Sequence, residues 1–139
     1  MALTYSDALI TRVLTESRTI ALVGASPRPE RASHRVMRFL QSRGHKVYPV
    51  NPREAGSSIN GETVLASLDE LAGPVDMVDI FRRTSEAGDA VDDAIRIAAK
   101  AVWLQLDVID EDAARRAEQA GLTVIMDRCP VIEYRRLGL

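Results

Sequence analysis

The chain has 139 residues, of which 46% are hydrophobic, a content that excludes a wholly disordered chain and suffices for one core. Its 18 basic and 20 acidic residues leave a formal net charge of −2, which argues against broad, non-specific nucleic-acid binding. The single cysteine, Cys129, excludes an internal disulfide framework, and no segment is apolar for long enough to cross a membrane. Since no leader-like segment is visible either, we expect one soluble, cytoplasmic domain over residues 1–139.

Apolar runs bounded by turn residues alternate with helical periodicity along most of the chain. The apolar runs predict five buried strands, over residues 19–23, 46–50, 75–81, 101–106 and 122–126. Helices are predicted from Ser6 or Asp7, from Ser33 to Gly44, from Ser67, over residues 85–100 and from Asp110 to Ala120. Pro49 is expected to end the second strand early, because proline cannot donate to a strand ladder.

Alternating strands and helices predict an α/β fold: a Rossmann-like, doubly wound, five-stranded parallel sheet with helices on both faces. With the strands numbered along the chain, we expect the order 3-2-1-4-5, which puts the switch point between strands one and four. Ligands of such sheets bind outside the carboxyl ends of the strands at the switch point. The residues that follow each strand are therefore the candidates for a binding site.

The first strand ends in Gly24-Ala25-Ser26, and two prolines delay the next helix, so the segment is not the G-x-G-x-x-G fingerprint of dinucleotide-binding domains. The backbone N–H groups of Ala25 and Ser26 can still bind a phosphate, assisted by the guanidinium groups of Arg28 and Arg31. We expect a side chain at Gly24 to block this approach and to leave the fold intact. The alternative is a solvated, charged loop.

The second strand is followed by Asn51-Pro52-Arg53, where an NAD-binding domain normally has an acidic residue that accepts hydrogen bonds from the ribose. Arg53 instead favours a ligand with an additional phosphate on its ribose, a group that NADP and coenzyme A (CoA) share. The alternative is that Pro52-Arg53 forms only a rigid surface turn.

The next two strands also end in residues that can face a ligand. Phe81 can pack on an adenine ring and Arg82 can reach a phosphate, although a core aromatic and an exposed arginine are the alternative. Gln105 ends the fourth strand and is expected to face the ligand. Asp79 lies inside the third strand, and we expect it to accept backbone hydrogen bonds at the sheet edge rather than to act in catalysis.

Catalytic and metal-binding patterns are weak. His34 and His45 do not have metal-ligand spacing with Cys129, so we predict no metal site. An inert, buried thiol is the favoured interpretation of Cys129, because no histidine is placed in sequence to activate it. We predict no catalytic residue.

The strand-end blocks together resemble the family of small, single-domain CoA-binding proteins, whose fold is that of the CoA-binding domain of succinyl-CoA synthetase. The blocks that carry the resemblance are Ala21–Ser26, Tyr48–Pro52, Val75–Arg82, Trp103–Asp107 and Met126–Pro130. Asp107 departs from the pattern, because the family usually has glycine there, and this puts in doubt the local turn beside Gln105.

The resemblance implies binding of CoA or an acyl-CoA, with CoA as the cofactor. From the charge balance and the absence of a long apolar segment we expect no nucleic-acid or membrane partner. It implies that Gly24, Ala25 and Ser26 hold the diphosphate, with help from Arg28 or Arg31. Asn51, Pro52 and Arg53 would contact the adenosine and its phosphate. Phe81 and Arg82 would line the adenine side, and Gln105 and Cys129 would lie toward the pantetheine.

Three hypotheses follow for the function. The first is a CoA-binding module without catalysis of its own. The second is an NADP-binding, oxidoreductase-like protein, which needs the same basic residue as well as catalytic residues. The third is a regulatory interaction module that keeps the fold without a ligand, in which case Gly24 and Arg53 would be dispensable.

Overall fold

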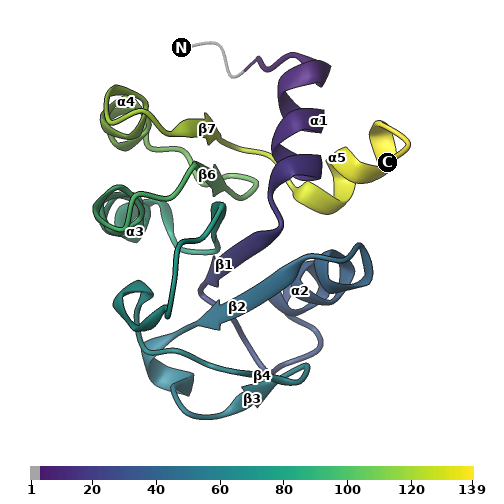
Figure 1. Cartoon of the computed structure of the whole chain (residues 1–139), viewed down its shortest axis with the longest axis vertical. Coiled ribbons are helices and arrows are strands. Elements are labelled where there is room, and N and C mark those ends of the chain that lie inside the picture. Colours follow the sequence, from purple (N-terminus) through teal and green to yellow (C-terminus); the bar gives the residue numbers. More distant parts are fainter. Residues whose placement is uncertain (1–3) are drawn as a thin grey trace.

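The computed structural model describes residues 4–139 as a three-layer α/β fold around a parallel sheet. The five strands of this sheet, in spatial order, are β2 (Lys46–Val50), β1 (Thr19–Val23), β5 (Met77–Ile80), β6 (Ala101–Leu104) and β7 (Thr123–Ile125). The helices are α1 (Asp7–Glu16), α2 (Ala32–Ser42), α3 (Thr84–Arg96), α4 (Glu111–Gln119) and α5 (Pro130–Arg136). Figure 1 shows α3 and α4 on one side of the sheet and α1, α2 and α5 on the other. The predicted Rossmann-like class is therefore confirmed.

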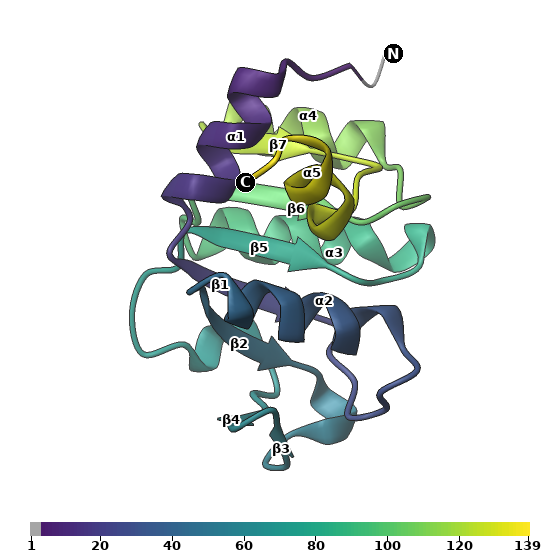
Figure 2. The same ribbon diagram turned by 90° about the vertical axis from the view of Figure 1, so that its right-hand side faces the viewer.

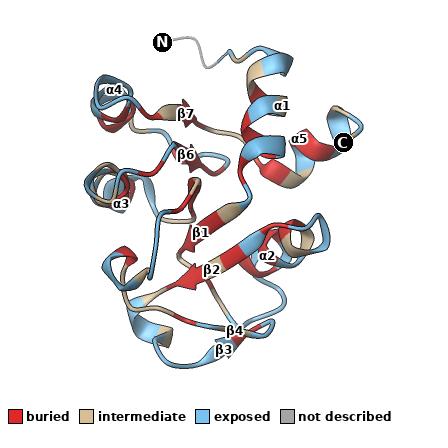
Figure 3. Cartoon of the chain, viewed as in Figure 1, coloured by how far each residue is buried: buried red, intermediate tan, exposed pale blue. Residues whose placement is uncertain are grey.

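The sheet separates two apolar cores, because successive side chains of a strand point to opposite faces. In β1, Ala21 and Val23 pack in the core beneath α3 and α4, whereas Ile20 and Leu22 pack in the core beneath α1, α2 and α5. Figure 3 shows mostly buried strands, with exposed and intermediate residues on the edge strand β2. Burial on both faces explains why the strands read as uninterrupted apolar runs.

At two of the predicted helix starts, the side chain that was expected to cap the helix does so. The Ser6 hydroxyl accepts a hydrogen bond from the amide of Leu9 at 3.1 Å, and the Asp110 carboxylate accepts one from the amide of Ala113 at 3.0 Å. Each satisfies an amide that has no partner within its helix, which stabilises such a helix by about 1 kcal/mol.

The expected strand order 3-2-1-4-5 is wrong. The third long strand, β5, pairs with β1 on the side opposite to β2, so the order along the chain is 2-1-3-4-5 and the switch point lies between β1 and β5. The reason is the connection from β2 to β5, which crosses to the face opposite α2, where Leu68 and Val75 join the core beneath α3. Both orders use right-handed crossovers, and periodicity does not specify which face a connection takes.

The second strand also continues through Pro49, against expectation. β2 is the edge strand, and Pro49 lies in register with Leu22 of β1. An edge strand tolerates proline where the missing N–H is not needed for the ladder. On the outer side, the Pro49 carbonyl accepts a hydrogen bond from the amide of Leu65 at 2.9 Å, which covers this part of the edge.

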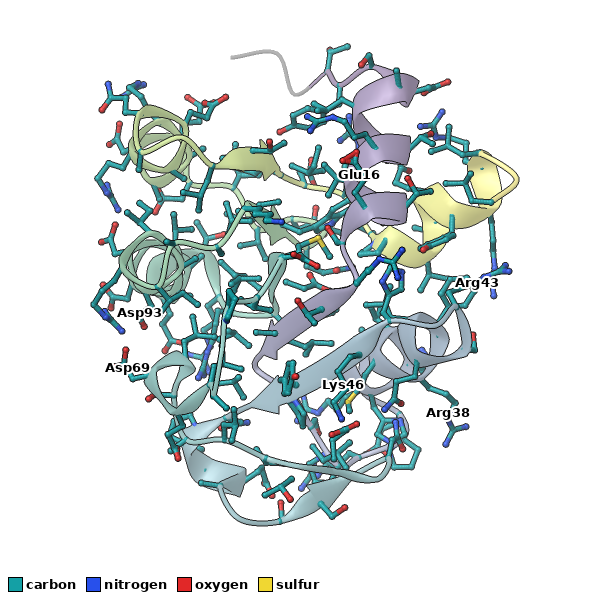
Figure 4. The ribbon with its side chains drawn as sticks, viewed as in Figure 1. Glu16, Arg38, Arg43, Lys46, Asp69 and Asp93 are labelled. Carbon is teal, nitrogen blue, oxygen red and sulfur yellow. The ribbon has the colours of Figure 1, made fainter. Side chains whose placement is uncertain are left out.

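Two elements were not predicted: α5 and a hairpin of two short strands, β3 (Ser58–Ile59) and β4 (Glu62–Thr63). Two short 3-10 turns, η1 (Pro52–Glu54) and η2 (Leu68–Glu70), complete the structure. The hairpin is joined to the sheet by an ion pair between Lys46 of β2 and Glu62 of β4, and Figure 4 labels Lys46 on the edge strand. Within residues 4–139, every helix is too short or too polar to cross a membrane.

Candidate functional site

A cavity of about 670 Å³ lies at the carboxyl ends of the parallel strands. Figure 2 shows the strands from the side, with the arrowheads of β2 and β5 directed toward the same edge of the molecule, and β1 runs parallel to both. The cavity is lined by Gly24, Ala25, Ser26, Arg28, Arg31, Ala32, Ser33, Asn51, Arg53, Glu54, Phe81, Arg82, Gln105, Leu106 and Val108. All the predicted site residues except Pro52 and Cys129 therefore lie together around it.

Sequence reasoning missed several lining residues because they do not directly end a strand. Ala32 and Ser33 form the first turn of α2, Glu54 belongs to η1, and Leu106 and Val108 lie on the loop after β6. The signal available for Ala32 and Ser33 was their place at the start of a helix that follows a phosphate-type loop.

Gly24 is required by the close approach of two strand ends. Its φ of +90° lies in the left-handed region, and an added Cβ would lie 2.0 Å from the backbone oxygen of Phe81. The expectation that a side chain here would leave the fold intact is wrong, because the side chain would collide with the backbone after β5. Glycine at this position therefore maintains the adjacent ends of β1 and β5.

The turn after β1 is held by hydrogen bonds to the end of β2. The amides of Gly24 and Ala25 both donate to the carbonyl of Val50, at 2.9 and 3.3 Å, so the Ala25 amide is engaged by the protein. The Ser26 hydroxyl accepts from the amide of Arg28 at 3.2 Å. The loop is therefore ordered by the protein's own contacts.

The first turn of α2 presents further donors to the cavity. The amides of Ala32 and Ser33 have no acceptor in the described part of the chain, as is usual for the first turn of a helix. The first turn contains no acidic side chain, and the N-cap residue, Arg31, makes no side-chain cap hydrogen bond. The partial positive charge of the helix start is therefore not offset by a carboxylate of the helix's own first turn.

Asn51 joins two loops of the site. Its amide nitrogen donates to the carbonyl of Ala25 at 2.9 Å, and its side-chain oxygen accepts from the amide of Arg53 at 3.0 Å. These contacts fix the loop after β1 relative to the loop after β2. Asn51 is therefore a positioning residue for Arg53, and its predicted contact with an adenosine remains a prediction.

Four guanidinium groups surround the cavity, those of Arg28, Arg31, Arg53 and Arg82. None of them forms an ion pair with any carboxylate of residues 4–139, and Glu54 is the single acidic residue among those that line the cavity. By contrast, the arginines of α3 and α4 are paired, as for Arg116 with Asp92 at 2.9 Å. The cavity thus concentrates positive charge that the protein does not neutralise.

Gln105 and Asp79 are buried polar groups with unsatisfied atoms. Gln105 is 9% exposed, and its side-chain oxygen has no hydrogen-bond partner in the described structure. Asp79 is fully buried in β5, and neither of its carboxylate oxygens has a partner there. The expectation that Asp79 accepts backbone hydrogen bonds is therefore wrong, and burial raises the pKa of its carboxyl well above the ordinary value.

The turn after Gln105 explains the departure at Asp107. Asp107 has a φ of 67°, in the left-handed region that favours glycine and that aspartate tolerates better than most residues. Its amide donates to the Asp127 carboxylate at 2.7 Å, and its carbonyl accepts from the Thr84 hydroxyl at 3.2 Å. The turn is therefore formed despite the missing glycine.

A second cavity, of about 620 Å³, lies next to the first, between α2 and α5. It shares Ala32, Gln105 and Leu106 with the first cavity, and Cys129 lies in its wall. Cys129 is 8% exposed and belongs to the core beneath α1, α2 and α5. Cys129 thus lies in the wall of the second cavity and not of the first, and Gln105 lies where the two cavities meet.

Fold and site together define a class: an α/β domain with an arginine-rich cavity at the carboxyl ends of the parallel strands of its sheet. The model of the CoA binding domain family matches residues 18–135, and the chain belongs to this family. The chain is 36% identical over 124 residues to the uncharacterized protein YneT of Bacillus subtilis, a match that covers 89% of this chain and 90% of that protein.

Solved structures give the same result for the fold. A hypothetical protein from Pyrococcus horikoshii superposes with a TM-score of 0.91 at 36% identity, covering 99% of this chain and 95% of the other. The dinucleotide-forming acetyl-coenzyme A synthetase 1 of Candidatus Korarchaeum cryptofilum, in complex with phosphate and ADP, matches with a TM-score of 0.69 at 26% identity. That match covers 77% of this chain and 25% of the synthetase, so the fold also occurs as one part of a larger enzyme.

Proposed function

We propose that this protein binds CoA or an acyl-CoA at the carboxyl ends of its parallel strands, without catalysis of its own. The observation that carries the proposal is the set of unpaired guanidinium groups around a cavity of about 670 Å³, a size within the roughly 300–1,000 Å³ of small-molecule sites. Membership of the CoA binding domain family supports this choice of polyanion.

Each part of CoA has a matching feature in the first cavity or in the second cavity beside it. The diphosphate lies against the turn Gly24-Ala25-Ser26 and the start of α2, where guanidinium groups of Arg28 and Arg31 complete the hydrogen bonding. Arg53 pairs with the phosphate on the ribose, and Asn51 and Pro52 shape the loop that positions it. Phe81 and Arg82 take the adenine side, and the pantetheine arm passes Gln105 toward Cys129.

The chemistry of the lining favours binding over catalysis. The titratable groups of this cavity are arginines, which stay protonated at all physiological pH values, and Glu54. Such a set holds negative charge in place, whereas proton transfer needs a group whose pKa lies near the working pH.

An NADP-binding, oxidoreductase-like protein is the second candidate. It is favoured by the same Arg53, because NADP also has a phosphate on its adenosine ribose. The two candidates differ in the ligand's other half, so direct competition separates them.

The test is titration calorimetry of the purified protein, stripped of ligand, with CoA, dephospho-CoA, NADP and NAD. We expect saturable binding of CoA, weaker binding of dephospho-CoA and no preference for either nicotinamide cofactor. Preference for NADP over CoA would support the second candidate. Failure of all four to bind would overturn both and leave the interaction module as the surviving hypothesis.

A further inference from the structure

The second cavity differs in character from the first. Its walls include apolar side chains from α2 and α5, among them Val36, Phe39 and Val131. Two large apolar side chains at this cavity, Leu106 and Ile132, are 45% and 50% exposed, which is unusual in a chain with few exposed hydrophobic residues. An apolar cavity of this size suits a small organic group.

The two cavities meet at Ala32, Gln105 and Leu106. Gln105 is about nine-tenths buried and lines both cavities, and its side-chain oxygen has no hydrogen-bond partner in the described structure. A pantetheine arm has two amide N–H groups, and either can donate to this oxygen and so satisfy a buried acceptor. The second cavity therefore continues the first past Gln105, in the direction of the proposed pantetheine arm.

The second cavity is bordered by basic side chains. Its lining includes Arg35, Arg38 and Arg135, together with His34, and no aspartate or glutamate. Arg35 donates to the carbonyl of Glu30 at 2.6 Å, and the guanidinium group of Arg135 lies 5.6 Å from the centre of the Phe39 ring. Arg38 has no ion-pair partner within residues 4–139, and Figure 4 shows it extending outward from α2. The apolar cavity is thus bordered by cations.

We propose that the second cavity holds the acyl group of an acyl-CoA, and that the bordering arginines select an acyl chain that ends in a carboxylate. The proposal rests on the proposed function, because the nucleotide part of the ligand must first be held in the first cavity. Methylene groups of the acyl chain pack on Val36, Phe39 and Val131, while the terminal carboxylate reaches Arg38 or Arg135. The thioester lies beside Gln105.

The experiment compares two acyl-CoA probes that differ in one terminal group. Valeryl-CoA and glutaryl-CoA have acyl chains of the same length, and only the latter ends in a carboxylate. We expect calorimetry of the wild-type protein to give roughly fivefold tighter binding of glutaryl-CoA than of valeryl-CoA, the upper range for a solvent-accessible ion pair. Valeryl-CoA should in turn bind more tightly than free CoA, because its chain is buried.

Arg38→Ala is the diagnostic variant, because Arg38 is exposed and its loss leaves the fold intact. It should reduce the preference for glutaryl-CoA to within twofold and leave the affinities for valeryl-CoA and CoA unchanged. Arg12→Ala, which removes an exposed arginine of α1 that lines neither cavity, is the matched control and should keep the full preference.

The outcomes separate this proposal from the one on which it rests. Equal affinities for CoA, valeryl-CoA and glutaryl-CoA would overturn the acyl site and leave CoA binding intact. Tighter binding of valeryl-CoA than of glutaryl-CoA, or a glutaryl preference that survives Arg38→Ala and Arg135→Ala together, would overturn the role of the arginines. If no CoA compound binds at all, the proposed function itself fails.

Discussion

Arg53→Ala is expected to separate the phosphate on the ribose from the rest of CoA. Arg53 is exposed, lines the cavity and has no ion pair in the described structure, so its guanidinium group is free to pair with a ligand. A charge-assisted hydrogen bond contributes about 1.5–3 kcal/mol, and exposure to solvent places Arg53 at the lower end of that range. We therefore expect Arg53→Ala to weaken the binding of CoA by about tenfold and the binding of dephospho-CoA by less than about twofold.

Calorimetry of two proteins with two ligands forms a thermodynamic cycle in which effects common to both ligands cancel. The coupling between Arg53 and the phosphate should shrink as salt is added, because the pair is open to solvent. Arg12→Ala is the control for a change in total charge, since it removes the same charge from the surface of α1. Equal weakening of CoA and dephospho-CoA by Arg53→Ala would refute the assignment of Arg53 to this phosphate.

Three further predictions concern stability. Gly24→Ala should lower the free energy of unfolding, measured by urea denaturation, by about 2–4 kcal/mol, because the new Cβ would lie 2.0 Å from the Phe81 backbone oxygen. Gly44→Ala is the control: at a φ of +91° with open space around it, it should lower the free energy of unfolding by only about 1 kcal/mol. Equal losses in the two variants would contradict the close approach of Gly24 to Phe81. Burial raises the pKa of Asp79, so wild-type stability should fall as pH rises from the unfolded value of about 3.9 toward the native pKa, by up to about 1.4 kcal/mol per pH unit, and Asp79→Asn should remove this slope. Burial lowers the pKa of His45, so the stability that its neutral form contributes is present above about pH 6.5 and is lost as pH falls through the native pKa. His45→Gln should reduce this dependence of the unfolding free energy on pH.

The chemistry of the strand ends could be predicted from the sequence, whereas their arrangement could not be predicted fully. The residues that follow β1, β2, β5 and β6 reach one cavity because parallel strands end at a common edge, and this holds for either strand order. For that reason the wrong order did not disturb the predicted site. Pro52 and Cys129 were assigned to the site by the family resemblance, and the structure puts neither of them in the wall of the first cavity.

What the sequence left open depends on contacts between distant segments. Nothing local shows that a Cβ at Gly24 would meet Phe81, since the two residues become neighbours only when β1 and β5 pair. The hairpin β3–β4 is different, because Asn60-Gly61 at positive φ is a strong turn signal that could have been used. The hydrogen bond from Asn51 to the Ala25 carbonyl likewise appears only once the loops are side by side, whereas the one that Asn51 accepts from the Arg53 amide is local to its own turn.

Asn51 tests whether the loops of the site are ordered before the ligand arrives. Asn51→Ala removes the hydrogen bonds to the Ala25 carbonyl and the Arg53 amide, at about 1 kcal/mol each, so the unfolding free energy should fall by about 2 kcal/mol. Hydrogen exchange at the Arg53 amide of the ligand-free protein should accelerate. The affinities for CoA and for dephospho-CoA should fall by the same factor. A variant that loses affinity while the free protein keeps its stability and exchange rates would instead make Asn51 a direct ligand contact, because only a positioning residue alters the protein without its ligand.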